Sequence, residues 1–240
     1  MKILAFDSAA AAASAALYED GTLLAENYQR AGLTHSRTLL PMAEAMLSLC
    51  GMDFGAVEAL AVTAGPGSFT GLRIGISLVK GLAAANRLPC AGVSTLEAIA
   101  ACAPRMDACL CVVMDARAGQ VYNAVFDLSG VYPARCTPDR AIRIEDLLKE
   151  LEKEEKKLII TGDGAHLMPD IWPVMPEHLR YGRAYGVARA AQHMFASCEA
   201  AVCAELFSAE KLVPSYHRLP QAERERAAKL AAQGKKRTEV

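Results

Sequence analysis

The hydrophobic residues of this chain fall into short apolar runs separated by turns, and the first of these runs ends in an acid. Residues 2–7 form the first run, which ends in Asp7, and further runs follow at residues 13–18 and 22–26. Short apolar runs bounded by small or turn-forming residues are typical of buried strands. The pattern predicts three strands joined by tight turns at the start of the chain.

The same order of runs returns in the second half of the chain. Residues 109–115 form a strand-like run that ends in Asp115, residues 120–126 form the next run, and a third begins at Val131. A supersecondary unit that occurs twice in one chain predicts two similar halves. Because helical patterns and another strand follow each copy, we expect an α/β protein with mixed sheets and flanking helices.

This duplication divides the chain into three regions. We expect a first subdomain at residues 1–107 and a second at residues 108–218. Residues 219–240 consist mainly of charged residues and alanine without an apolar stripe, so we expect a flexible tail there.

Two helices of the first half are predicted at residues 34–50 and 72–86. The second is apolar almost all round, and a helix without a polar face must be covered on two sides. One side can meet the sheet, and the other predicts a neighbour, which is either another chain or the second subdomain. Gly75 and Gly81 in this helix are expected to let another helix approach closely.

The second half contains further helical patterns at residues 144–157 and 185–198. A strand-like run at residues 157–160 leads into a turn that contains Gly162 and Gly164. This turn has two interpretations. Its backbone could approach a nucleoside, or it only reverses the chain after a strand.

The glycine-rich loop between the strand-like run before residue 64 and the helix at residues 72–86 has unusual chemistry. Its glycines and hydroxyl residues are Gly65, Gly67, Gly71, Ser68 and Thr70. Glycine permits positive φ, and Ser or Thr can cap a helix N-terminus. The loop either holds an anion or a partner's backbone, or only makes a tight turn. It is not a Walker A motif, because no lysine follows its last glycine, and its spacing is not that of the dinucleotide fingerprint.

Composition narrows the class of protein. The chain has 240 residues, of which 52% are hydrophobic, and a net charge of −1. No apolar run reaches the roughly 20 residues that span a bilayer, and Asp7 comes too early for a signal peptide, so we expect a cytoplasmic protein. The eight cysteines contain no CxxC and are expected to be reduced core thiols. Because the net charge is close to zero, any basic surface that contacts RNA must be a local patch of this chain or belong to a partner.

Several short motifs of this chain resemble the TsaB (YeaZ) family, a branch of the superfamily of actin, hexokinase and heat-shock ATPases. The matching segments are residues 3–8, 35–36, 39–41, 65–75, 93–98, 115–117 and 214–216 with Arg218. The glycine block at residues 65–75 is highly specific to this family. One departure is Ser8-Ala9, where the family usually has Thr-Ser, followed by an alanine-rich turn.

The resemblance implies two actin-like ATPase (ribonuclease H-like) subdomains, whose hairpins embrace nucleotide phosphates and metal in the superfamily. It also implies a role in making threonylcarbamoyladenosine beside the anticodon of tRNAs. There the family is a non-catalytic partner of TsaD, the catalytic subunit, and TsaE, an ATPase, joins them. We therefore expect contact with tRNA only through the complex and no membrane partner. The nearly all-apolar helix at residues 72–86 adds the expectation of a homodimer when the chain is alone, built from the two helices of the first half.

The resemblance also suggests site residues. We expect no cofactor in the isolated chain, with room for ATP or ADP at the interface with the partner. The residues expected at the partner interface or in its motif are His35, Gly65, Gly67, Ser68, Thr70, Gly71, Arg73, Gly75 and Gly81. Arg73 lies where a helix N-terminus disfavours a cation, which predicts a compensating carboxylate, carbonyl or phosphate. That group belongs either to a partner or to this chain.

The residues themselves argue against catalysis by the isolated chain. The five histidines never occur at i, i+4 spacing, which excludes the paired-histidine metal site of a TsaD-like subunit or a metalloprotease. We expect neither catalytic nor metal-binding residues. His35 alone is interpreted as a capping or packing histidine.

Nucleotide-binding candidates are Asp7, Asp115, Gly162 and Gly164. The turn at residues 116–119 lacks the paired glycines that cradle a phosphate, and its Arg117 is expected to form a local ion pair with Asp115 or a partner contact. Two alternatives to the scaffold function remain. One is an active ATPase or small-molecule kinase that uses Asp7 or Asp115 as base, and the other is a purely structural homodimer.

Overall fold

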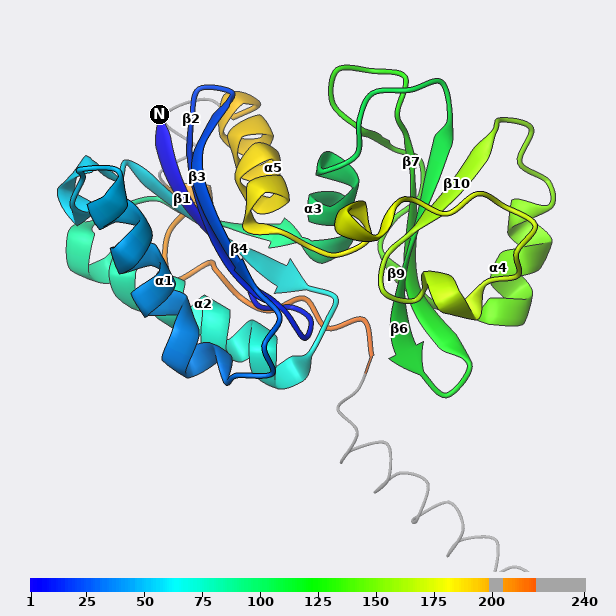
Figure 1. Cartoon of the computed structure of the whole chain (residues 1–240), viewed down its shortest axis with the longest axis horizontal. Coiled ribbons are helices and arrows are strands. Elements are labelled where there is room, and N and C mark those ends of the chain that lie inside the picture. Colours follow the sequence, from blue (N-terminus) through cyan, green and yellow to red (C-terminus); the bar gives the residue numbers. More distant parts are fainter. Residues whose placement is uncertain (199–204, 219–240) are drawn as a thin grey trace, which may run out of the picture.

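A computed structural model of the chain describes residues 1–198 and 205–218, and it consists of two lobes that lie side by side (Figure 1). Each lobe contains a mixed sheet with helices. The tail predicted at residues 219–240 lies outside the described residues. Within the described ranges, no helix is both long and apolar enough to cross a membrane.

The first lobe is built on a sheet with the strand order β3-β2-β1-β4-β5. Its strands are β1 (Lys2–Asp7), β2 (Ala13–Glu19), β3 (Thr22–Gln29), β4 (Ala59–Gly65) and β5 (Cys90–Ser94). β1, β2 and β3 pair antiparallel, whereas β4 and β5 add in parallel. The predicted meander is confirmed, and β3 runs on to Gln29.

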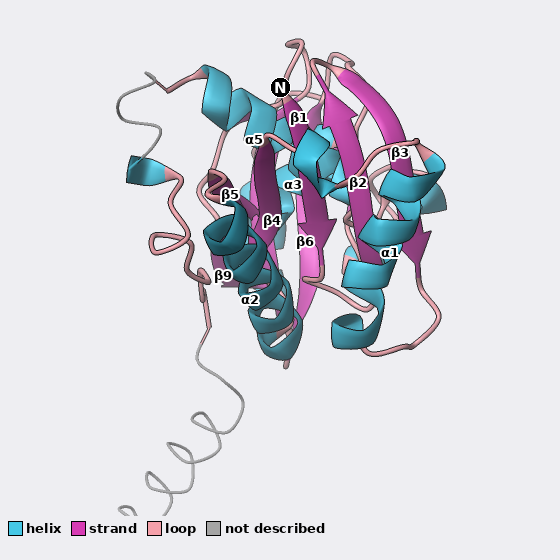
Figure 2. Cartoon of the chain, turned by 90° about the vertical axis from the view of Figure 1, so that its left-hand side faces the viewer, coloured by secondary structure: helices cyan, strands magenta, loops and turns pink. Residues whose placement is uncertain are grey.

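Helices cover both faces of this sheet. α1 (His35–Leu49) and α2 (Phe69–Asn86) lie on one face, as Figure 2 shows. α5 (Ala184–Ala196) packs on the other face, together with α3 (Thr95–Ala101). Side chains of β1 alternate between the two faces as strand geometry requires, with Leu4 and Phe6 toward α1 and α2 and Ile3 and Ala5 toward α5.

The second lobe repeats the strand order of the first. Its strands are β6 (Cys109–Arg117), β7 (Gln120–Asp127), β8 (Ala134–Arg135), β9 (Arg140–Arg143) and β10 (Leu158–Thr161). β6 pairs antiparallel with β7 and parallel with β10, and β7 pairs with β8 and β9 on its other side. An isolated parallel bridge between Ile160 and Val174 occupies the place of the fifth strand. The duplication is therefore present in both sheets.

The remaining helices are short. They are α4 (Ile144–Leu151) and the 3-10 helices η1 (Phe54–Ala56), η2 (Ala165–Leu167) and η3 (Glu177–Leu179). α4 ends before the charge run at residues 152–157, which has no apolar side chain to bury. Cys90, Cys109 and Cys111 are buried free thiols.

Several predicted boundaries in the second lobe were wrong. The run predicted from Val131 forms two short strands, β8 and β9, because Pro133 and Pro138 interrupt it and proline cannot donate to a ladder. β6 continues through Asp115 to Arg117, so its hairpin turn is tighter than the predicted turn at residues 116–119.

The packing also differs from the predicted division at residues 108–218. α5 contacts the first sheet through small residues on both sides, among them Ala5, Ala16 and Ala188. Phe207 and Leu212 are buried in the first lobe as well. Packing therefore places α5, Phe207 and Leu212 in the first lobe. Alanines let α5 approach that sheet closely.

α3 joins the two lobes. It packs against α5 of the first lobe, and Leu96, Ile99 and Ala100 lie in the same core as Leu110 and Phe126 of the second lobe. One short helix is thus part of the hydrophobic interior of both lobes.

We expect Leu96→Ala to destabilise the whole chain, because Leu96 is fully buried in this shared core. Removing such a side chain costs about 2–5 kcal/mol. Leu206→Ala is the matched control, since Leu206 is 54% exposed, and should change the free energy of unfolding by less than about 0.5 kcal/mol. Urea unfolding of both variants measures the difference, and equal effects would contradict the shared core.

Candidate functional site

A cleft of about 810 Å³ lies between the lobes. The first lobe lines it with residues 9–11, 32–35, 66–71 and 215–218, and the second lobe with the end of β6 and with Asp163. The glycine-rich loop therefore faces the second copy of the hairpin across this cleft.

The glycine-rich loop leads directly into α2, which begins earlier than predicted, at Phe69. Ser68 is the N-cap residue, and its Oγ accepts a hydrogen bond from the Gly71 N–H at 3.3 Å. Thr70 is exposed in the first turn and makes no cap contact. Of the two hydroxyl residues considered as caps, Ser68 therefore satisfies the helix terminus.

Close backbone contacts explain three of the glycines. A Cβ at Gly67 would lie 2.5 Å from the Ala9 carbonyl oxygen, and one at Gly71 would lie 2.1 Å from that of Ser8. A Cβ at Gly75 would lie 2.3 Å from the Ser8 Oγ, which itself donates to the Gly71 carbonyl at 2.9 Å. The start of α2 thus lies directly on the first hairpin.

Gly75 and Gly81, the two glycines expected to let another helix approach α2, differ in exposure. Gly75 is buried against Ser8 and therefore faces the inside of the chain rather than a neighbouring helix. Gly81 is exposed, and a Cβ there would meet nothing within 4 Å. The helix itself is less uniformly covered than predicted, because residues such as Arg73 and Ser77 are exposed.

Asp7 lies at the end of β1 and is buried, with 2% of its surface exposed. Its Oδ1 accepts hydrogen bonds from the Thr63 hydroxyl at 2.8 Å and the Ala9 N–H at 3.0 Å. A Cβ at Gly182 would lie 2.5 Å from Oδ2, so the chain closes over this carboxyl. Burial raises the pKa of Asp7 above its ordinary value, although these two hydrogen bonds oppose the shift.

Asp115 occupies the corresponding place in the second lobe but is exposed. Its Oδ1 accepts a hydrogen bond from the backbone N–H of Arg117 at 2.6 Å, and its own N–H donates to Asp163 Oδ1 at 3.1 Å. Arg117 therefore contacts Asp115 through its backbone, and the described residues show no ion pair between the two side chains. Burial raises the pKa of Asp163, and the nearby Asp115 carboxylate adds to this shift.

Sequence reasoning did not single out Asp163. The available signal was the Gly-Asp-Gly sequence directly after a predicted strand. Its flanking glycines pack on β6, because a Cβ at Gly162 would lie 1.9 Å from the Val113 carbonyl oxygen and one at Gly164 would lie 3.0 Å from the Asp115 nitrogen.

Four backbone N–H groups at the two hairpins donate to side chains of this chain. A nucleotide phosphate would be held by backbone N–H donors at the hairpins. Here the Ser8 N–H donates to Thr63, the Ala9 N–H to Asp7, the Asp115 N–H to Asp163, and the Arg117 N–H to Asp115. The chain's own side chains therefore occupy these donors.

His35 is the first residue of α1 and lies at the cleft. Its Nε2 is 2.9 Å from the Ala10 carbonyl oxygen, while Nδ1 is buried without a hydrogen-bond partner in the described part of the chain. The described residues contain no group of three or more His, Cys, Asp or Glu side chains that could hold a metal ion. His35 thus contacts the first hairpin, as a packing residue would.

Arg73 lies on the exposed side of the first turns of α2. Its guanidinium stacks over the Phe69 ring, with Cζ 3.8 Å from the ring centroid, and its Nε donates to the Tyr216 hydroxyl at 3.0 Å. No acid of the described ranges pairs with it. Within this chain, the Arg73 cation is therefore stabilised by the Phe69 ring and the Tyr216 hydroxyl rather than by a carboxylate.

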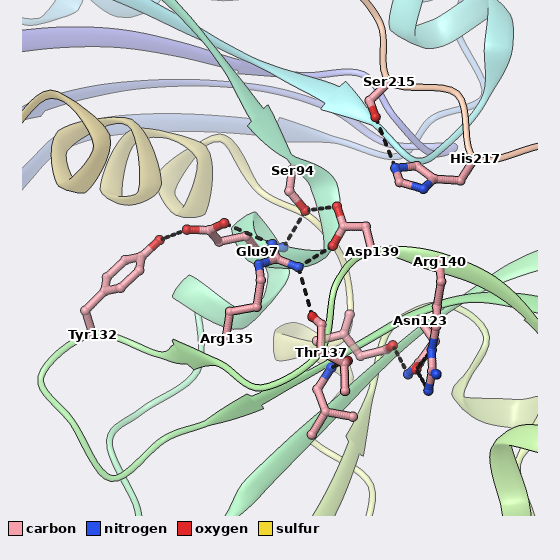
Figure 3. Close-up of polar contacts among 12 residues, drawn as sticks. Ser94, Glu97, Asn123, Tyr132, Arg135, Thr137, Asp139, Arg140, Ser215 and His217 are labelled. Atoms are coloured by element: carbon pink, nitrogen blue, oxygen red, sulfur yellow. Dashed lines mark hydrogen bonds and ion pairs between the residues drawn. The ribbon is translucent and has the colours of Figure 1, made fainter. Parts of the chain in front are cut away.

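A polar network joins the lobes on the side of α3, as Figure 3 shows. Ser94 Oγ donates to Asp139 at 2.5 Å, Tyr132 donates to Glu97 at 2.8 Å, and Arg135 pairs with both Glu97 and Asp139. Because Ser94 and Glu97 belong to the first lobe and the others to the second, the network connects the two lobes. Nothing in the local sequence pattern pointed to it.

Comparisons with known proteins agree with this fold. A family model described as TsaD, tRNA N6-adenosine threonylcarbamoyltransferase, matches residues 29–235. The Bacillus subtilis (strain 168) protein named tRNA threonylcarbamoyladenosine biosynthesis protein TsaB is 30% identical over 226 residues, which cover 93% of this chain and 96% of that protein. The chain belongs to the TsaB (YeaZ) family.

Other members support the same assignment. The Escherichia coli (strain K12) TsaB is 36% identical over 175 residues, covering 71% of this chain and 75% of that protein. The solved structure of YeaZ from Pseudomonas aeruginosa has a TM-score of 0.77 and 28% identity, covering 90% of this chain and 99% of that one. A match to the Erythrobacter litoralis protein named tRNA N6-adenosine threonylcarbamoyltransferase covers only 20% of that protein. Among these individual relatives, the match that spans nearly the whole chain is to TsaB, the family that the motifs resemble.

We expect Asp7→Asn to remove one pH-dependent component of stability. A raised pKa means that the native state binds more protons than the unfolded chain between the ordinary pKa of Asp, roughly 4, and the native pKa of Asp7. The stability of the wild type therefore falls as pH rises across that range. Asparagine cannot ionise.

Urea unfolding of the wild type and Asp7→Asn from pH 4 to pH 8 tests this. The raised pKa of Asp163 affects both proteins equally, so its contribution cancels in the difference between them. The free energy of unfolding of Asp7→Asn minus that of the wild type should increase with pH, by at most about 1.4 kcal/mol per pH unit. A difference that does not change with pH would contradict the assignment.

Ser68→Ala should lower the free energy of unfolding by about 0.5–2 kcal/mol, because it removes the N-cap of α2. Thr70→Ala on the same turn is the control and should stay within about 0.5 kcal/mol of the wild type, since Thr70 is exposed. Equal losses in thermal or urea unfolding would show that Ser68 does not act as the cap.

Proposed function

We propose that this chain is a non-catalytic subunit in the biosynthesis of threonylcarbamoyladenosine next to the anticodon of tRNAs. It binds a TsaD-like catalytic subunit in the cytoplasm, a TsaE-like ATPase joins them, and the chain meets tRNA only through this complex. The observation that carries the proposal is the state of the two hairpins, whose backbone donors bind the chain's own Thr63, Asp7, Asp163 and Asp115 side chains. The likeness to TsaB over nearly the whole chain supports it.

The outer face of α1 and α2 is the proposed docking surface for the TsaD-like subunit. On α1, Leu49 is 89% exposed and Leu40 is 36% exposed. On α2, three apolar side chains are only partly buried: Ile74, Leu78 and Leu82. Gly81 adds no side chain to this face. When the chain is alone, a second copy uses the same face, which gives a homodimer.

We assign any ATP or ADP of this system to the interface with the partner rather than to this chain's own hairpins. The alternative function is an active ATPase or small-molecule kinase, favoured by the cleft of about 810 Å³ and by Asp115 and Asp163 at its wall. Magnesium-dependent ATP turnover by the isolated chain separates the two functions.

Reconstitution tests the proposal. TsaD-like and TsaE-like proteins of the same organism, threonylcarbamoyl adenylate, ATP and tRNA are combined with and without this chain. Modification should require the chain, and the chain alone should neither modify tRNA nor turn over ATP. ATP turnover that Asp7→Ala abolishes with folding intact, or modification without the chain, would refute it.

Gly81→Glu should weaken both the homodimer and the TsaD-like complex by at least about 100-fold, because an unpaired charge buried in an interface costs several kcal/mol. The fold itself should be unaffected, since the space around Gly81 is open. Val131→Glu is the control, because Val131 is 84% exposed in the second lobe. Analytical sedimentation and binding to the immobilised partner measure the effect, and equal affinities for both variants would exclude this face.

A further inference from the structure

Residues 205–218 run along the first lobe toward the cleft (Figure 1, orange). The Cys90 N–H donates to the Phe207 carbonyl at 2.6 Å, which attaches the segment to the edge strand β5. Leu212 is 4% exposed and lies in the core beneath α1 and α2. The backbone of Phe207 and the side chain of Leu212 therefore anchor the segment ahead of residues 213–218.

From Leu212 the chain crosses the glycine-rich loop. The Ser215 N–H donates to the Ala64 carbonyl at 2.7 Å. The Ser215 carbonyl oxygen lies 2.2 Å from where a Cβ of Gly65 would be, and Gly65 has a φ of +131°. The loop therefore needs glycine at residue 65 because this segment lies directly on it.

Tyr216 then contacts the first turns of α2. Its ring stacks on Phe69 with centroids 4.7 Å apart, and its hydroxyl accepts the hydrogen bond from Arg73 Nε. Since the Arg73 guanidinium also stacks on Phe69, that side chain is held at two points. Its two terminal NH₂ groups have no acceptor in the described part of the chain, so they remain free to donate.

The end of the segment reaches the second lobe. Arg218 Nη1 donates to the Arg117 carbonyl at 3.0 Å, in the β6–β7 hairpin. Ser215 Oγ and His217 Nε2 lie 3.0 Å apart and brace the turn between these contacts. Residues 212–218 thus connect the core of the first lobe, the glycine-rich loop, α2 and the second hairpin.

We propose that residues 212–218 form a strap that prepares α2 for docking, with Tyr216 as the positioning residue that presents Arg73 to a carboxylate on the partner protein. This inference rests on the proposed function, because the partner protein is the TsaD-like subunit proposed to dock on α1 and α2. A planar guanidinium offers paired N–H donors that match a carboxylate, and fixing it beforehand lowers the entropy lost on binding. The rim formed by Arg73, Arg117 and Arg218 has no acid partner in the described residues, which favours an acidic surface on the other side.

A double-mutant cycle in the full chain tests the strap. Arg73→Ala, Tyr216→Phe and the double variant are compared for their affinity to the TsaD-like subunit at two salt concentrations. Tyr216→Phe keeps the ring on Phe69 and removes only the hydroxyl, so its unfolding transition should match that of the wild type. Arg30→Ala and Tyr181→Phe are matched controls, because Arg30 stacks on the Tyr181 ring at 4.4 Å but does not belong to α2.

We expect Arg73→Ala to weaken binding at least about 10-fold and to reduce its salt dependence, and Tyr216→Phe to weaken it about 3-fold or more. The double variant should bind like Arg73→Ala alone, because Tyr216 acts through Arg73. The two control variants should bind like the wild type.

Each other outcome overturns the inference. Unchanged affinity of Arg73→Ala excludes the carboxylate contact, and a Tyr216→Phe effect that persists without Arg73 excludes positioning. Loss of binding to a short single-stranded RNA, with the partner affinity retained, assigns the arginines to nucleic acid instead. If the wild type neither binds the TsaD-like subunit nor is required for modification, the proposed function fails together with the inference.

Discussion

The first turn of α2 lies directly on the backbone of the first hairpin, and most features of the candidate site depend on this contact. The carbonyls of Ser8 and Ala9 occupy the space where side chains at Gly71 and Gly67 would be. Ser68 donates its N–H to Ala9, and Ser8 donates its hydroxyl to Gly71. Any larger residue at these glycines would separate the helix from the sheet, so the contact sets the direction of α2 and the position of the cleft wall.

This contact also changes what the hairpin can bind. In a fold whose hairpins hold phosphates, the backbone donors must point to the ligand. Here the Ser8 and Ala9 donors turn to Thr63 and to the buried Asp7, and the second hairpin is closed in the same way by Asp115 and Asp163. The two acids at the ends of the repeated strands therefore accept hydrogen bonds from the chain's own turns.

The two lobes are packed together through small side chains and through α3, which contributes to both lobes. Alanines on the first sheet and on α5 allow close packing, and Gly186 lies against the Ala98 carbonyl where α5 crosses α3. α3 then contributes Leu96 and Ile99 to the second core. The network around Arg135 adds polar contacts across the same junction, so the lobes share apolar and charged interactions rather than only a linker.

The sequence by itself determined the elements, their duplication and the family, because these follow from local periodicity and from contiguous motifs. The short apolar runs predict β1, β2, β6 and β7, and the block at residues 65–75 carries the family resemblance. Ser68 as a cap was also foreseeable, since a cap acts within one turn of its helix.

Only the tertiary structure decided where α5 packs, why Asp7 is buried, and which group compensates Arg73. Arg73 and Tyr216 are 143 positions apart, and Asp7 is closed in by Gly182 from the far half of the chain. Contacts of this kind depend on how sheets and helices pack in three dimensions. No periodicity or spacing within a single segment encodes them, so the sequence located Asp7 at the end of a strand and only the fold showed that its carboxyl is buried.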